Sequence, residues 1–499
     1  MNKKPTVDIE QLKRGGVIKL KEKDMFSVWV RAVCCNLDAV KLRKVADLAE
    51  KYGRGTILFT TRQFPIIPHV HFKDIEAVQN ELKEVHLVLD RCGARVRNAD
   101  VCYDSNICPH AVTSPISLGE KLDEFWQNDP GGHKIKTSIV GCEKQCTSPR
   151  VLSDIGFVGV ADGRFDVYVG GRLGLKPNIG FKVASGATEE QGVRIVKNLL
   201  DFIHLEGKEG ERSADLIARY GEERVKEEAT KNLDEKVDYQ PLACDTKIKG
   251  KVPGIILRIR ATNGEVTSGQ ARKIADLAEE YGLGFVHFAV RGAPEIPGIN
   301  EINIEAIRKD ISEVGLRILD RGTDNLQSCF GNYCTNGIVD THGLLRKIEI
   351  LIGRLGVNDL DIKISAAGCP NTCAISPISD IGFWGVIEPV VNLKNCTGCQ
   401  ICTRACKVNA IAIKEGKAVI DYDKCKWCMD CILACPFDGI SAGRRGYAVS
   451  VGGRGGYSPS DRRGEETKLG KVIAEFISEE EAIKLSKELL LKLKNGEEL

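Results

Sequence analysis

Apolar and polar positions near the N-terminal end of the chain follow a pattern that predicts short strands around one amphipathic helix. The stretches MFSVWVRAV, at 25–33, and TILFTT, at 56–61, are apolar and typical of buried strands. Between them, apolar residues recur at helical spacing, and the pattern stops at Gly53. Those apolar residues are Val45, Leu48, Ala49 and Tyr52. The pattern therefore predicts an α+β unit.

The same pattern returns in the second half of the chain, which predicts a tandem duplication. Between the last two repeated motifs the first half has only ADGRFD, whereas the second half has about sixty residues there. A module is therefore inserted into a loop of the second copy. The matching segments are 41–55 with 270–284 (KLRKVADLAEKYGRG and QARKIADLAEEYGLG), FTTRQFPIIP with FAVRGAPEIP, 154–160 with 380–386 (DIGFVGV and DIGFWGV), and 167–174 with 449–456 (VYVGGRLG and VSVGGRGG).

The repeat and the insertion predict how the chain is divided. Residues 206–240 are rich in Lys and Glu and lack turn residues, so we expect a solvated helix that connects the halves; a charged binding face is the weaker interpretation. The predicted parts are an N-terminal segment (1–26), a first half (27–205), a linker (206–250), the first part of a second half (251–389), an inserted domain (390–442) and the completion of the second half (443–499).

Charge and composition exclude several classes of partner. The 71 Lys and Arg residues nearly balance the 69 Asp and Glu residues, which leaves no global field for nucleic acid or a membrane surface. No run of eighteen apolar residues occurs, and the charged N-terminal stretch has no apolar segment behind it. We therefore expect a cytoplasmic protein, in which the twenty cysteines serve metal chemistry rather than disulfides.

Sixteen cysteines form four sets of four. Four thiolates that converge on one point suit a soft metal centre, and repeated Cys-x2-Cys-x2-Cys-x3-Cys is typical of a two-cluster ferredoxin, in which the fourth cysteine of each run binds the other 4Fe-4S cluster. A zinc ribbon is a weaker alternative, because it needs a longer gap between Cys-x2-Cys pairs. The first set is Cys102, Cys108, Cys142 and Cys146, the second is Cys329, Cys334, Cys369 and Cys373, and the ferredoxin-like sets are Cys396, Cys399, Cys402 with Cys435, and Cys425, Cys428, Cys431 with Cys406. The other cysteines, expected to be buried thiols, are Cys34, Cys35, Cys92 and Cys244.

With these motifs the chain resembles the siroheme-dependent sulfite and nitrite reductases, and most of all dissimilatory sulfite reductase with its two related subunits in one chain. The duplication, the cysteine sets, GCPNTC at 368–373, the VGGR segments and the inserted module carry the resemblance over nearly the whole sequence. It implies two halves about a pseudo-twofold axis, siroheme between them, and a cysteine that bridges a 4Fe-4S cluster to the siroheme iron. By motif position that cysteine is Cys373, with Cys146 as its counterpart.

Sulfite is an anion that loses oxygen as water, so its site needs cations that attract it and donate protons. Lys134 and Lys136 are two apart and therefore share one face of a strand that leads to Cys142. The family holds sulfite with such a lysine pair and two arginines, for which the matches here are Arg31 and Arg97. A solvated lysine pair on an edge strand is the alternative.

Three further arginines are placed to bind the carboxylates of siroheme. They are Arg62 in TTRQ, and Arg172 and Arg454 in the VGGR segments. A tight turn is the alternative for VGGR, and a dinucleotide loop is disfavoured because no helix with a suitably spaced acidic residue follows. The histidines of the first half lack ligand spacing, which favours ordinary polar roles; they are His69, His71, His110 and His133.

The resemblance implies an enzyme that reduces sulfite to sulfide with six electrons. Nitrite reduction to ammonia and a non-catalytic siroheme and iron–sulfur electron-transfer protein are the alternatives. We expect one or two sirohemes and up to four 4Fe-4S clusters, although the spacing from Cys329 to Cys334 is one residue shorter than that from Cys102 to Cys108. No flavin or NAD(P) motif occurs, so an external electron-donor protein is expected to dock near the ferredoxin-like domain, and a homo-oligomer stays open.

The two predicted sites are unequal. In the family, cysteines of one half share a site with cations of the other, so the second cysteine set is expected to work with the lysine pair and its two arginines. The reciprocal positions hold Arg260, Lys363 and Asp361, and GTDNLQSC offers no arginine in place of Arg97. A carboxylate there repels an anion, so any tetrapyrrole beside the first cysteine set is expected to be structural or to store electrons.

Overall fold

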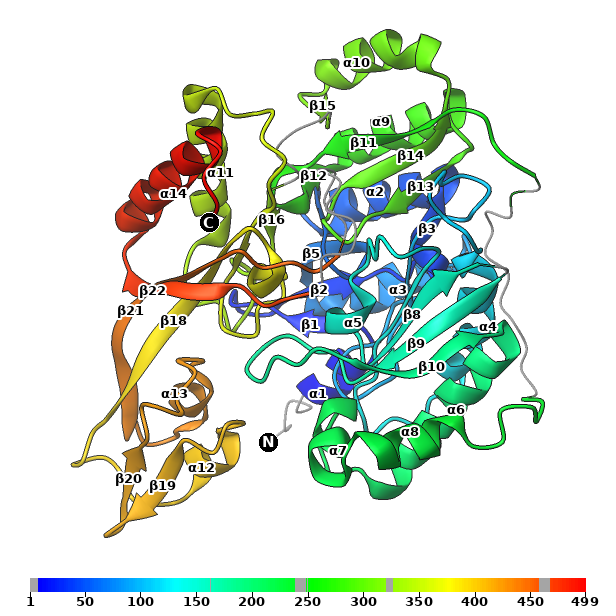
Figure 1. Ribbon diagram of the computed structural model, residues 1–499. Coiled ribbons are helices and arrows are strands. Elements are labelled where there is room, and N and C mark those ends of the chain that lie inside the picture. The colour runs from blue at the N-terminus through cyan, green and yellow to red at the C-terminus, as the bar shows by residue number, and fades with distance from the viewer. Residues whose placement is uncertain (1–7, 162, 238–247, 249, 320–325, 457–466) are drawn as a thin grey trace. The chain divides into compact units, whose positions relative to one another are not determined.

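The computed structural model describes residues 8–161, 163–237, 248, 250–319, 326–456 and 467–499 (Figure 1). By its contacts the chain divides into two compact units. The first comprises Met1–Arg172, Asn178–Asp320 and Gly455–Glu465, and the second comprises Leu173–Pro177, Arg321–Arg454 and Glu466–Leu499. This division does not follow the sequence repeat, because the start of the second copy belongs to the first unit.

Two sheets of the first unit exchange strands between the copies of the repeat. The end strand of each sheet comes from the other copy, and both exchanged strands pair antiparallel with their new neighbours. One sheet has the order β1 (Val17–Lys19), β2 (Met25–Trp29), β5 (Pro65–His71), β4 (Thr56–Phe59) and β12 (Glu265–Thr267). The other has the order β15 (Arg317–Ile318), β11 (Ile255–Arg260), β14 (Pro294–Ile299), β13 (Phe285–Phe288) and β3 (Asn36–Asp38).

The repeated helices follow the exchanged strands directly. Helix α2 (Ala39–Tyr52) begins after Asp38, whose side chain accepts a hydrogen bond from the N–H of Lys41, and it ends at Gly53 as the sequence predicts. Helix α9 (Ser268–Glu280) begins with a capping box formed by Thr267 and Gln270. Each helix buries a face rich in Ala and Leu, and the two helices pack on each other.

A third sheet of the first unit carries the first cysteine set. Its order is β10 (Phe181–Ala187), β9 (Arg164–Val169), β8 (Ile155–Val160), β7 (Thr137–Val140) and β6 (Asp100–Val101). Helices α4 (Pro115–Gln127) and α6 (Glu189–Glu206) pack against one another, and the core between them and the sheet contains Leu118, Phe157 and Phe165.

The predicted solvated helix between the halves was wrong in its described part. Residues 206–230 form two short helices, α7 (Ser213–Tyr220) and α8 (Glu222–Thr230), whose residues Leu216, Val225 and Ala229 belong to the core of the first unit. Apolar residues at wide spacing anchor one face of each helix in the core, while most charged residues of α8 stay exposed, and the abundant charges concealed that spacing. Residues 238–247 and 249, which include Cys244, lie outside the described residues.

The second unit contains one sheet and the inserted module. The sheet has the order β16 (Gln327–Ser328), β17 (Ile364–Ala367), β18 (Ile381–Val391), β21 (Ile440–Val451) and β22 (Lys471–Ile477), and it packs with α11 (Thr341–Leu355) and α14 (Glu479–Lys494). The module joins the ends of β18 and β21 and contains α12 (Ile401–Ala405), β19 (Ile411–Lys414), β20 (Lys417–Ile420) and α13 (Asp430–Ala434).

The mixed α+β class and the tandem duplication are confirmed by this arrangement. The remaining α-helices are α1 (Ile9–Arg14), α3 (Ile75–Lys83), α5 (Pro149–Leu152) and α10 (Ile304–Glu313). None of the helices in the described part of the chain has the length and apolar character needed to cross a membrane.

Candidate functional site

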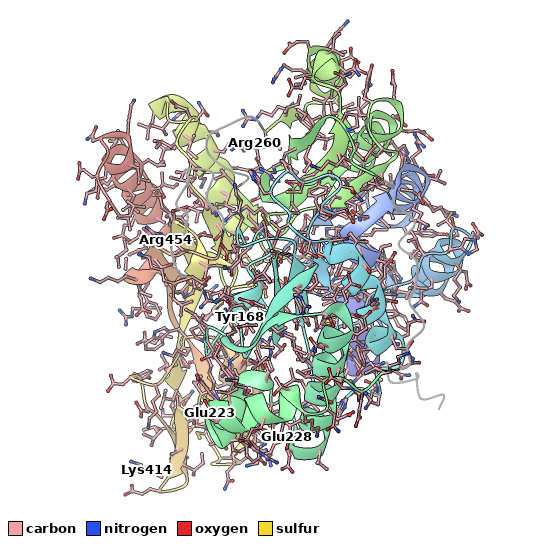
Figure 2. All side chains as sticks on the ribbon, turned by 45° about the vertical axis from the view of Figure 1, so that its right-hand side comes forward. Tyr168, Glu223, Glu228, Arg260, Lys414 and Arg454 are labelled. Carbon is pink, nitrogen blue, oxygen red and sulfur yellow. The ribbon has the colours of Figure 1, made fainter. Side chains whose placement is uncertain are left out.

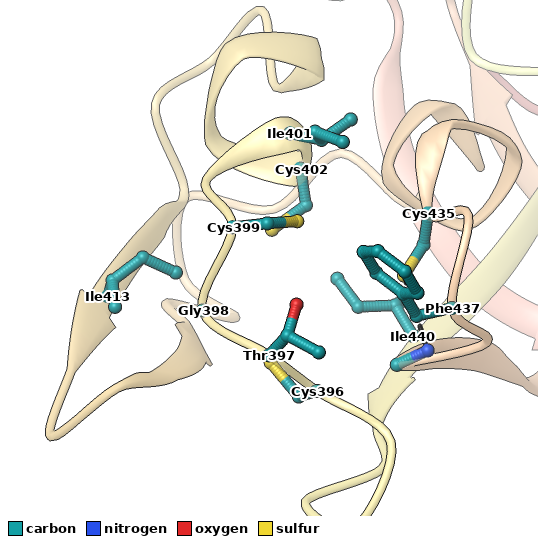
Figure 3. A pocket seen from close by; sticks show the side chains of 11 residues that line it. Cys396, Thr397, Gly398, Cys399, Ile401, Cys402, Ile413, Cys435, Phe437 and Ile440 are labelled. Carbon is teal, nitrogen blue, oxygen red and sulfur yellow. Dashed lines mark hydrogen bonds between the residues drawn. The ribbon is translucent and has the colours of Figure 1, made fainter.

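The inserted module gathers one ferredoxin-like cysteine set around a cavity. The cavity is lined by Cys396, Cys399, Cys402 and Cys435 together with Ile401, Ile413 and Phe437 (Figure 3). Cys396 and Cys399 come from one loop, Cys402 from the helix α12 that follows it, and Cys435 from the end of the second run. The structure therefore brings together the crossed set that the spacing predicts.

The other ferredoxin-like set also lies together. Burial, together with the smaller effects of the neighbouring thiols Cys428, Cys425 and Cys406, raises the pKa of Cys431 to about 12. Backbone N–H groups point at the sulfurs, as at the other set: Ala410 N donates to Cys406 Sγ at 3.2 Å and Trp427 N donates to Cys425 Sγ at 3.4 Å. Such donors stabilise thiolates and set cluster potentials.

The chemistry of these sets fits 4Fe-4S clusters. Thiols that raise one another's pKa on burial stay protonated unless a cation binds them, and cluster iron supplies that cation. Among the described residues, no group of three or more His, Cys, Asp or Glu side chains is arranged to hold a single metal ion.

The second cysteine set begins where β16 and β17 end. Cys329 Sγ accepts hydrogen bonds from the N–H groups of Gly331 and Gly368, each at 3.2 Å. Burial raises the pKa of Cys329, and the thiols of Cys373, Cys369 and Cys334 add to the effect. The shorter loop from Cys329 to Cys334 therefore still brings both cysteines to the set.

The first cysteine set is built in the same way. Cys102 directly follows β6, and its Sγ accepts a hydrogen bond from Gly141 N at 3.1 Å. Burial raises the pKa of Cys102, and the nearby thiols of Cys146, Cys108 and Cys142 raise it by smaller amounts. Burial raises the pKa of Cys146 to about 12.

Charged residues beside the first set are ones that the sequence analysis missed. The charges that act on the pKa of Cys146 include those of Arg258 and Glu295, which form an ion pair across β11 and β14. The same positions of the first copy hold Trp29 and Ile66, which pair across β2 and β5. A charged pair where the other copy has apolar residues was the signal that could have identified them. Arg260, which the repeat places opposite Arg31, also lies on β11 (Figure 2).

The predicted anion-binding cations come together around residues 97–100. Arg31 Nε donates to Asn98 Oδ1 at 3.3 Å, while Arg62 Nη2 donates to the carbonyl of Asn98 at 3.1 Å. The charge of Lys134 lowers the pKa of Cys92, and Arg97 Nη2 donates a hydrogen bond to the Cys92 sulfur at 3.4 Å. The charge of Lys136 favours the ionised form of Asp100, which forms an ion pair with Arg62.

The side chain of Arg31 is buried and is held in place by two neighbouring side chains. Its guanidinium forms an ion pair with Asp123 and stacks on the ring of Trp126 at 3.5 Å. Burial lowers its pKa to about 10, so it stays charged at neutral pH. Arg31 is therefore a fixed positive charge.

Arg97 is held by the turn that precedes it. Its Nη1 donates to the Arg91 carbonyl at 2.7 Å and its Nη2 to the Gly93 carbonyl at 3.2 Å. The Nε atoms of Arg97 and Arg62 are buried and have no hydrogen-bond partner among the described residues. Buried donors of this kind need an acceptor, and an anion in this region fits that requirement.

The lysine pair is positioned by an aspartate that the sequence analysis did not assign. Lys134 and Lys136 are half-buried and flank the buried Ile135, as expected for two residues on one face. Asp154 Oδ2 accepts the N–H of Lys136 at 2.9 Å and is itself held by Arg212 and Ser213. In the second copy Asp380 accepts the N–H of Lys363 in the same way, at 2.8 Å. The aspartate of each DIGF motif thus fixes a lysine backbone.

Arg62 and the arginines of the VGGR segments occupy different environments. Arg62 binds the carboxylate of Asp100 with Nη1, at 2.8 and 3.1 Å. Arg172 forms reciprocal backbone hydrogen bonds with Asn178, and Arg454 does so with Lys468. Arg172 Nη1 also pairs with Asp215 at 2.7 Å. Their roles as ligands of tetrapyrrole carboxylates stay predictions.

The loops that follow the VGGR arginines reach two cysteine motifs. Gly174 N donates to Thr372 Oγ1, in GCPNTC, at 3.1 Å. Gly456 has φ +148°, and a Cβ atom there would lie 2.2 Å from the carbonyl oxygen of Gln145, in GCEKQC. Close packing on the cysteine loop therefore requires the glycine that follows the second VGGR segment.

The histidines have ordinary structural contacts where these are resolved. His69 Nδ1 lies 3.3 Å from Glu22, His71 caps the turn at Lys73, and His133 contacts the carbonyl of Glu211. His110 lies in the loop after Cys108.

Repeated sheets and four sets of four cysteines define the class of duplicated iron–sulfur proteins. The chain belongs to the nitrite and sulphite reductase family. Its residues 92–237 and 321–491 match the "Nitrite and sulphite reductase 4Fe-4S domain", and residues 18–85 and 248–314 match the "Nitrite/Sulfite reductase ferredoxin-like half domain". The predicted family and the duplication are confirmed.

Relatives in this family carry the names of both sulfite and nitrite reductases. The chain is 34% identical over 204 residues to a coenzyme F420-dependent sulfite reductase of Methanocaldococcus jannaschii, covering 40% of this chain and 33% of that protein. It is 30% identical over 194 residues to one of the subunits of the anaerobic sulfite reductase of Salmonella typhimurium, covering 35% and 56%. It is 24% identical over 400 residues to a chloroplastic ferredoxin–nitrite reductase of Betula pendula, covering 73% and 68%.

The chain thus spans about a third of the length of the first of these relatives and somewhat over half of the length of the second. Among solved structures, the NirA protein of Mycobacterium tuberculosis superposes with a TM-score of 0.73 at 16% identity, covering 98% of this chain and 88% of that one. This likeness shows the shared fold.

Proposed function

We propose that the protein reduces sulfite to sulfide with siroheme and 4Fe-4S clusters. The balanced reaction consumes one hydrogensulfite ion, six electrons and six protons and yields one hydrosulfide ion and three waters. The observation that carries the proposal is the convergence of Arg31, Arg97, Lys134 and Lys136 on one segment, two of them with a buried orienting partner. An electron-transfer protein has no need of such a group.

Each cation has a role in this proposal. Arg31 and Arg97 are fixed guanidinium groups that attract the anion and donate charge-assisted hydrogen bonds to its oxygens. Lys134 and Lys136 lie on one face and donate both hydrogen bonds and protons as oxygen leaves as water. Asp154 holds the Lys136 backbone at its position.

When bound, siroheme would supply redox chemistry at its iron, with electrons from a neighbouring cluster. Among the chain's own residues, the unpartnered Nε of Arg62 and the arginines of the VGGR segments suit the carboxylates of this group. Cys373 is proposed as the thiolate shared by cluster and siroheme iron, with Cys146 as its counterpart in the first set.

Nitrite is the second candidate substrate. The relative that matches the largest part of this chain among those above bears the name ferredoxin–nitrite reductase. Nitrite is also a small anion that loses oxygen as water, with six electrons and eight protons giving an ammonium ion and two waters. The same cations suit it.

One experiment tests the proposal. The protein is purified anaerobically, its iron and siroheme are quantified, and turnover of sulfite and of nitrite with a reduced viologen dye is compared. A higher kcat/KM for sulfite supports the proposal, whereas a higher value for nitrite supports the second candidate. A loaded protein that reduces neither anion would be a non-catalytic member of the family.

A further inference from the structure

Two equivalent turns of the repeat, η1 (Val33–Cys35) and η3 (Thr262–Gly264), differ in their last two residues. These residues are Cys-Cys in the first copy and Asn-Gly in the second. All four have positive φ, 50° and 64° in η1 and 65° and 70° in η3. Left-handed backbone suits asparagine and glycine and disfavours other side chains. The first copy therefore keeps Cys34 and Cys35 in a conformation that their side chains disfavour, and such strain persists where neighbouring contacts hold it.

The sulfur of Cys35 is fastened to the strand that leads to the first cysteine set. Cys35 Sγ accepts a hydrogen bond from Val101 N at 3.3 Å and donates one to the Ala99 carbonyl at 3.6 Å. Val101 ends β6, which is an end strand of its sheet and directly precedes Cys102. The fully buried sulfur therefore satisfies a backbone N–H that has no further strand to pair with.

The sulfur of Cys34 is fastened to helix α4. Cys34 Sγ donates a long hydrogen bond to the Ile116 carbonyl, at 3.9 Å. A Cβ atom on Gly119, inside α4, would lie 3.0 Å from this sulfur and 3.1 Å from Val101 Cγ2. Glycine weakens the interior of a helix relative to alanine. Close packing on the sulfur of Cys34 gives a reason for glycine at this position of α4.

The side chain of Arg31 is held by the same two elements. On one side its Nε donates to Asn98 Oδ1 at 3.3 Å, and Asn98 Nδ2 donates to the Ala32 carbonyl at 2.9 Å. On the other side the guanidinium pairs with Asp123 and stacks on Trp126, both on α4. The guanidinium and the two sulfurs therefore connect one short stretch of chain to the same two neighbours.

Arg62 depends on the segment 98–101 as well. Its Nη2 donates to the Asn98 carbonyl at 3.1 Å, and its Nη1 pairs with Asp100 at 2.8 Å. A shift of this segment would therefore move Arg31 and Arg62 together. Charge-assisted hydrogen bonds are strong only at short distance and good angles, so the position of the segment matters for binding an anion.

We propose that Cys34 and Cys35 are positioning residues, whose sulfurs hold Arg31 in place by fastening its turn to α4 and to the segment 98–101. They act through Arg31 and do not touch the anion. This inference rests on the proposed function, because Arg31 is a ligand of sulfite there. The turn after Arg260 has no sulfur, which agrees with the expectation that the reciprocal site does not serve turnover.

The test replaces the cysteine pair with the residues of the second copy. Cys34→Asn/Cys35→Gly keeps residues that suit positive φ and removes both sulfurs. Asn263→Ala is the matched control, because it puts strain into the equivalent turn and leaves the cysteines in place. For each holoprotein the siroheme content, the thermal unfolding midpoint, the sulfite dissociation constant by optical titration, and kcat and KM with a reduced viologen dye are measured.

We expect the pair variant to bind sulfite about tenfold more weakly and to raise KM more than it lowers kcat, because a displaced Arg31 makes a poorer charge-assisted hydrogen bond. Asn263→Ala should lower the unfolding midpoint and leave the dissociation constant unchanged, which separates positioning from stability. Unchanged sulfite affinity in the pair variant would overturn the inference. An equal loss of affinity in Asn263→Ala would overturn it too, because binding would then follow stability alone.

Two additions keep the inference testable in every case. If the pair variant does not fold, Cys34→Ala and Cys35→Ala are measured singly, and unchanged affinity in both contradicts the inference. If the unchanged protein is loaded with siroheme and binds neither sulfite nor nitrite, the proposed function fails. Hydrogen exchange of the Val101 amide then decides the positioning role: at least about tenfold faster exchange in Cys35→Ala supports it, and an equal rate rejects it.

Discussion

Phe59 and Phe288 occupy the same position in the two copies of the repeat, and their rings stack on each other with 5.0 Å between centroids and 24° between planes. Both side chains are fully buried. The contact joins β4 to β13, the two strands that receive an exchanged neighbour from the other copy. The two copies therefore share one core at this point.

Removing either ring should destabilise the first unit. We expect Phe59→Ala and Phe288→Ala each to cost about 3–5 kcal/mol, because a buried aromatic side chain leaves a cavity. The double variant should cost less than the sum, since the second substitution removes a partner already lost. Native-state hydrogen exchange of β4 and β13 measures the effect. Phe72→Ala, at a 40% exposed ring, is the matched control and should cost far less.

The charged contacts between α2 and α9 should matter much less. Arg43 on α2 binds Asp276 and Glu279 on α9. Arg272, at the equivalent position of α9, binds Asp47 and Glu50 at the equivalent positions of α2. The two arginine side chains are about a third exposed, and their carboxylate partners are more than half exposed. Surface ion pairs of this kind contribute roughly 0–1 kcal/mol each to stability. Arg43→Ala should therefore shift the melting temperature only slightly, and the shift should shrink in high salt. A loss as large as that of Phe59→Ala would contradict this ranking.

The crossed ligand sets predict which cluster each cysteine holds. Cys435→Ser should remove the cluster bound by Cys396, Cys399 and Cys402 and leave the other ferredoxin-like cluster intact, and Cys406→Ser should do the reverse. Electron paramagnetic resonance on anaerobic protein distinguishes the two signals. Iron analysis of the unchanged protein should approach about sixteen cluster irons for four sets. A preparation loaded with zinc would show that the sets serve another metal.

The bridging cysteine can be separated from the electron supply. Cys373→Ser should abolish reduction of the siroheme site while the ferredoxin-like clusters stay reducible, because these have their own ligands. Spectroscopic titration with a reductant follows both. Full turnover of sulfite in this variant would mean that another residue is the axial ligand.

The lysine pair should decide turnover. Lys134→Ala/Lys136→Ala removes two charge-assisted donors, each worth roughly 1.5–3 kcal/mol, so kcat/KM for sulfite should fall by at least about a hundredfold. Lys363→Ala, at the position equivalent to Lys136, should change it little. Steady-state kinetics with a reduced dye compares them, and the opposite ranking would assign catalysis to the other site.

Asp154 links acid stability to the position of Lys136. Burial alone raises the pKa of Asp154, but the charge and hydrogen bonds of Arg212, with those of Lys136 N–H and Ser213, outweigh it and lower the pKa below its usual 3.8. The carboxylate therefore stabilises the fold above pH 4, and this contribution is lost as pH falls through the lower folded value. Asp154→Asn should be less stable at neutral pH and should lose less stability on acidification, as measured by thermal unfolding across pH. An equal acid response in both proteins would exclude this role.

The sequence predicted those features that local patterns encode. Gly53 ends α2 as its periodicity indicates, and the α+β class and the duplication follow from repeated segments. The exchange of β3 and β12 could not be predicted, because three-residue strands carry no period and their partners lie more than two hundred residues away. The apolar contacts that anchor α7 and α8 in the core were hidden by the charge of these helices. Arg258 and Glu295 stand where the other copy has apolar residues, a signal in the aligned repeat, and the pairing of β11 with β14 shows that the two charges meet.

The strand exchange also determines when the fold can be completed. The edge of β4 is covered by β12, which follows it by roughly two hundred residues, or about 10–40 seconds of protein synthesis. Until then the nascent chain presents the open edge of β4, and open edges recruit strands of other molecules. Translation is therefore a stage at which this open edge exposes the protein to aggregation.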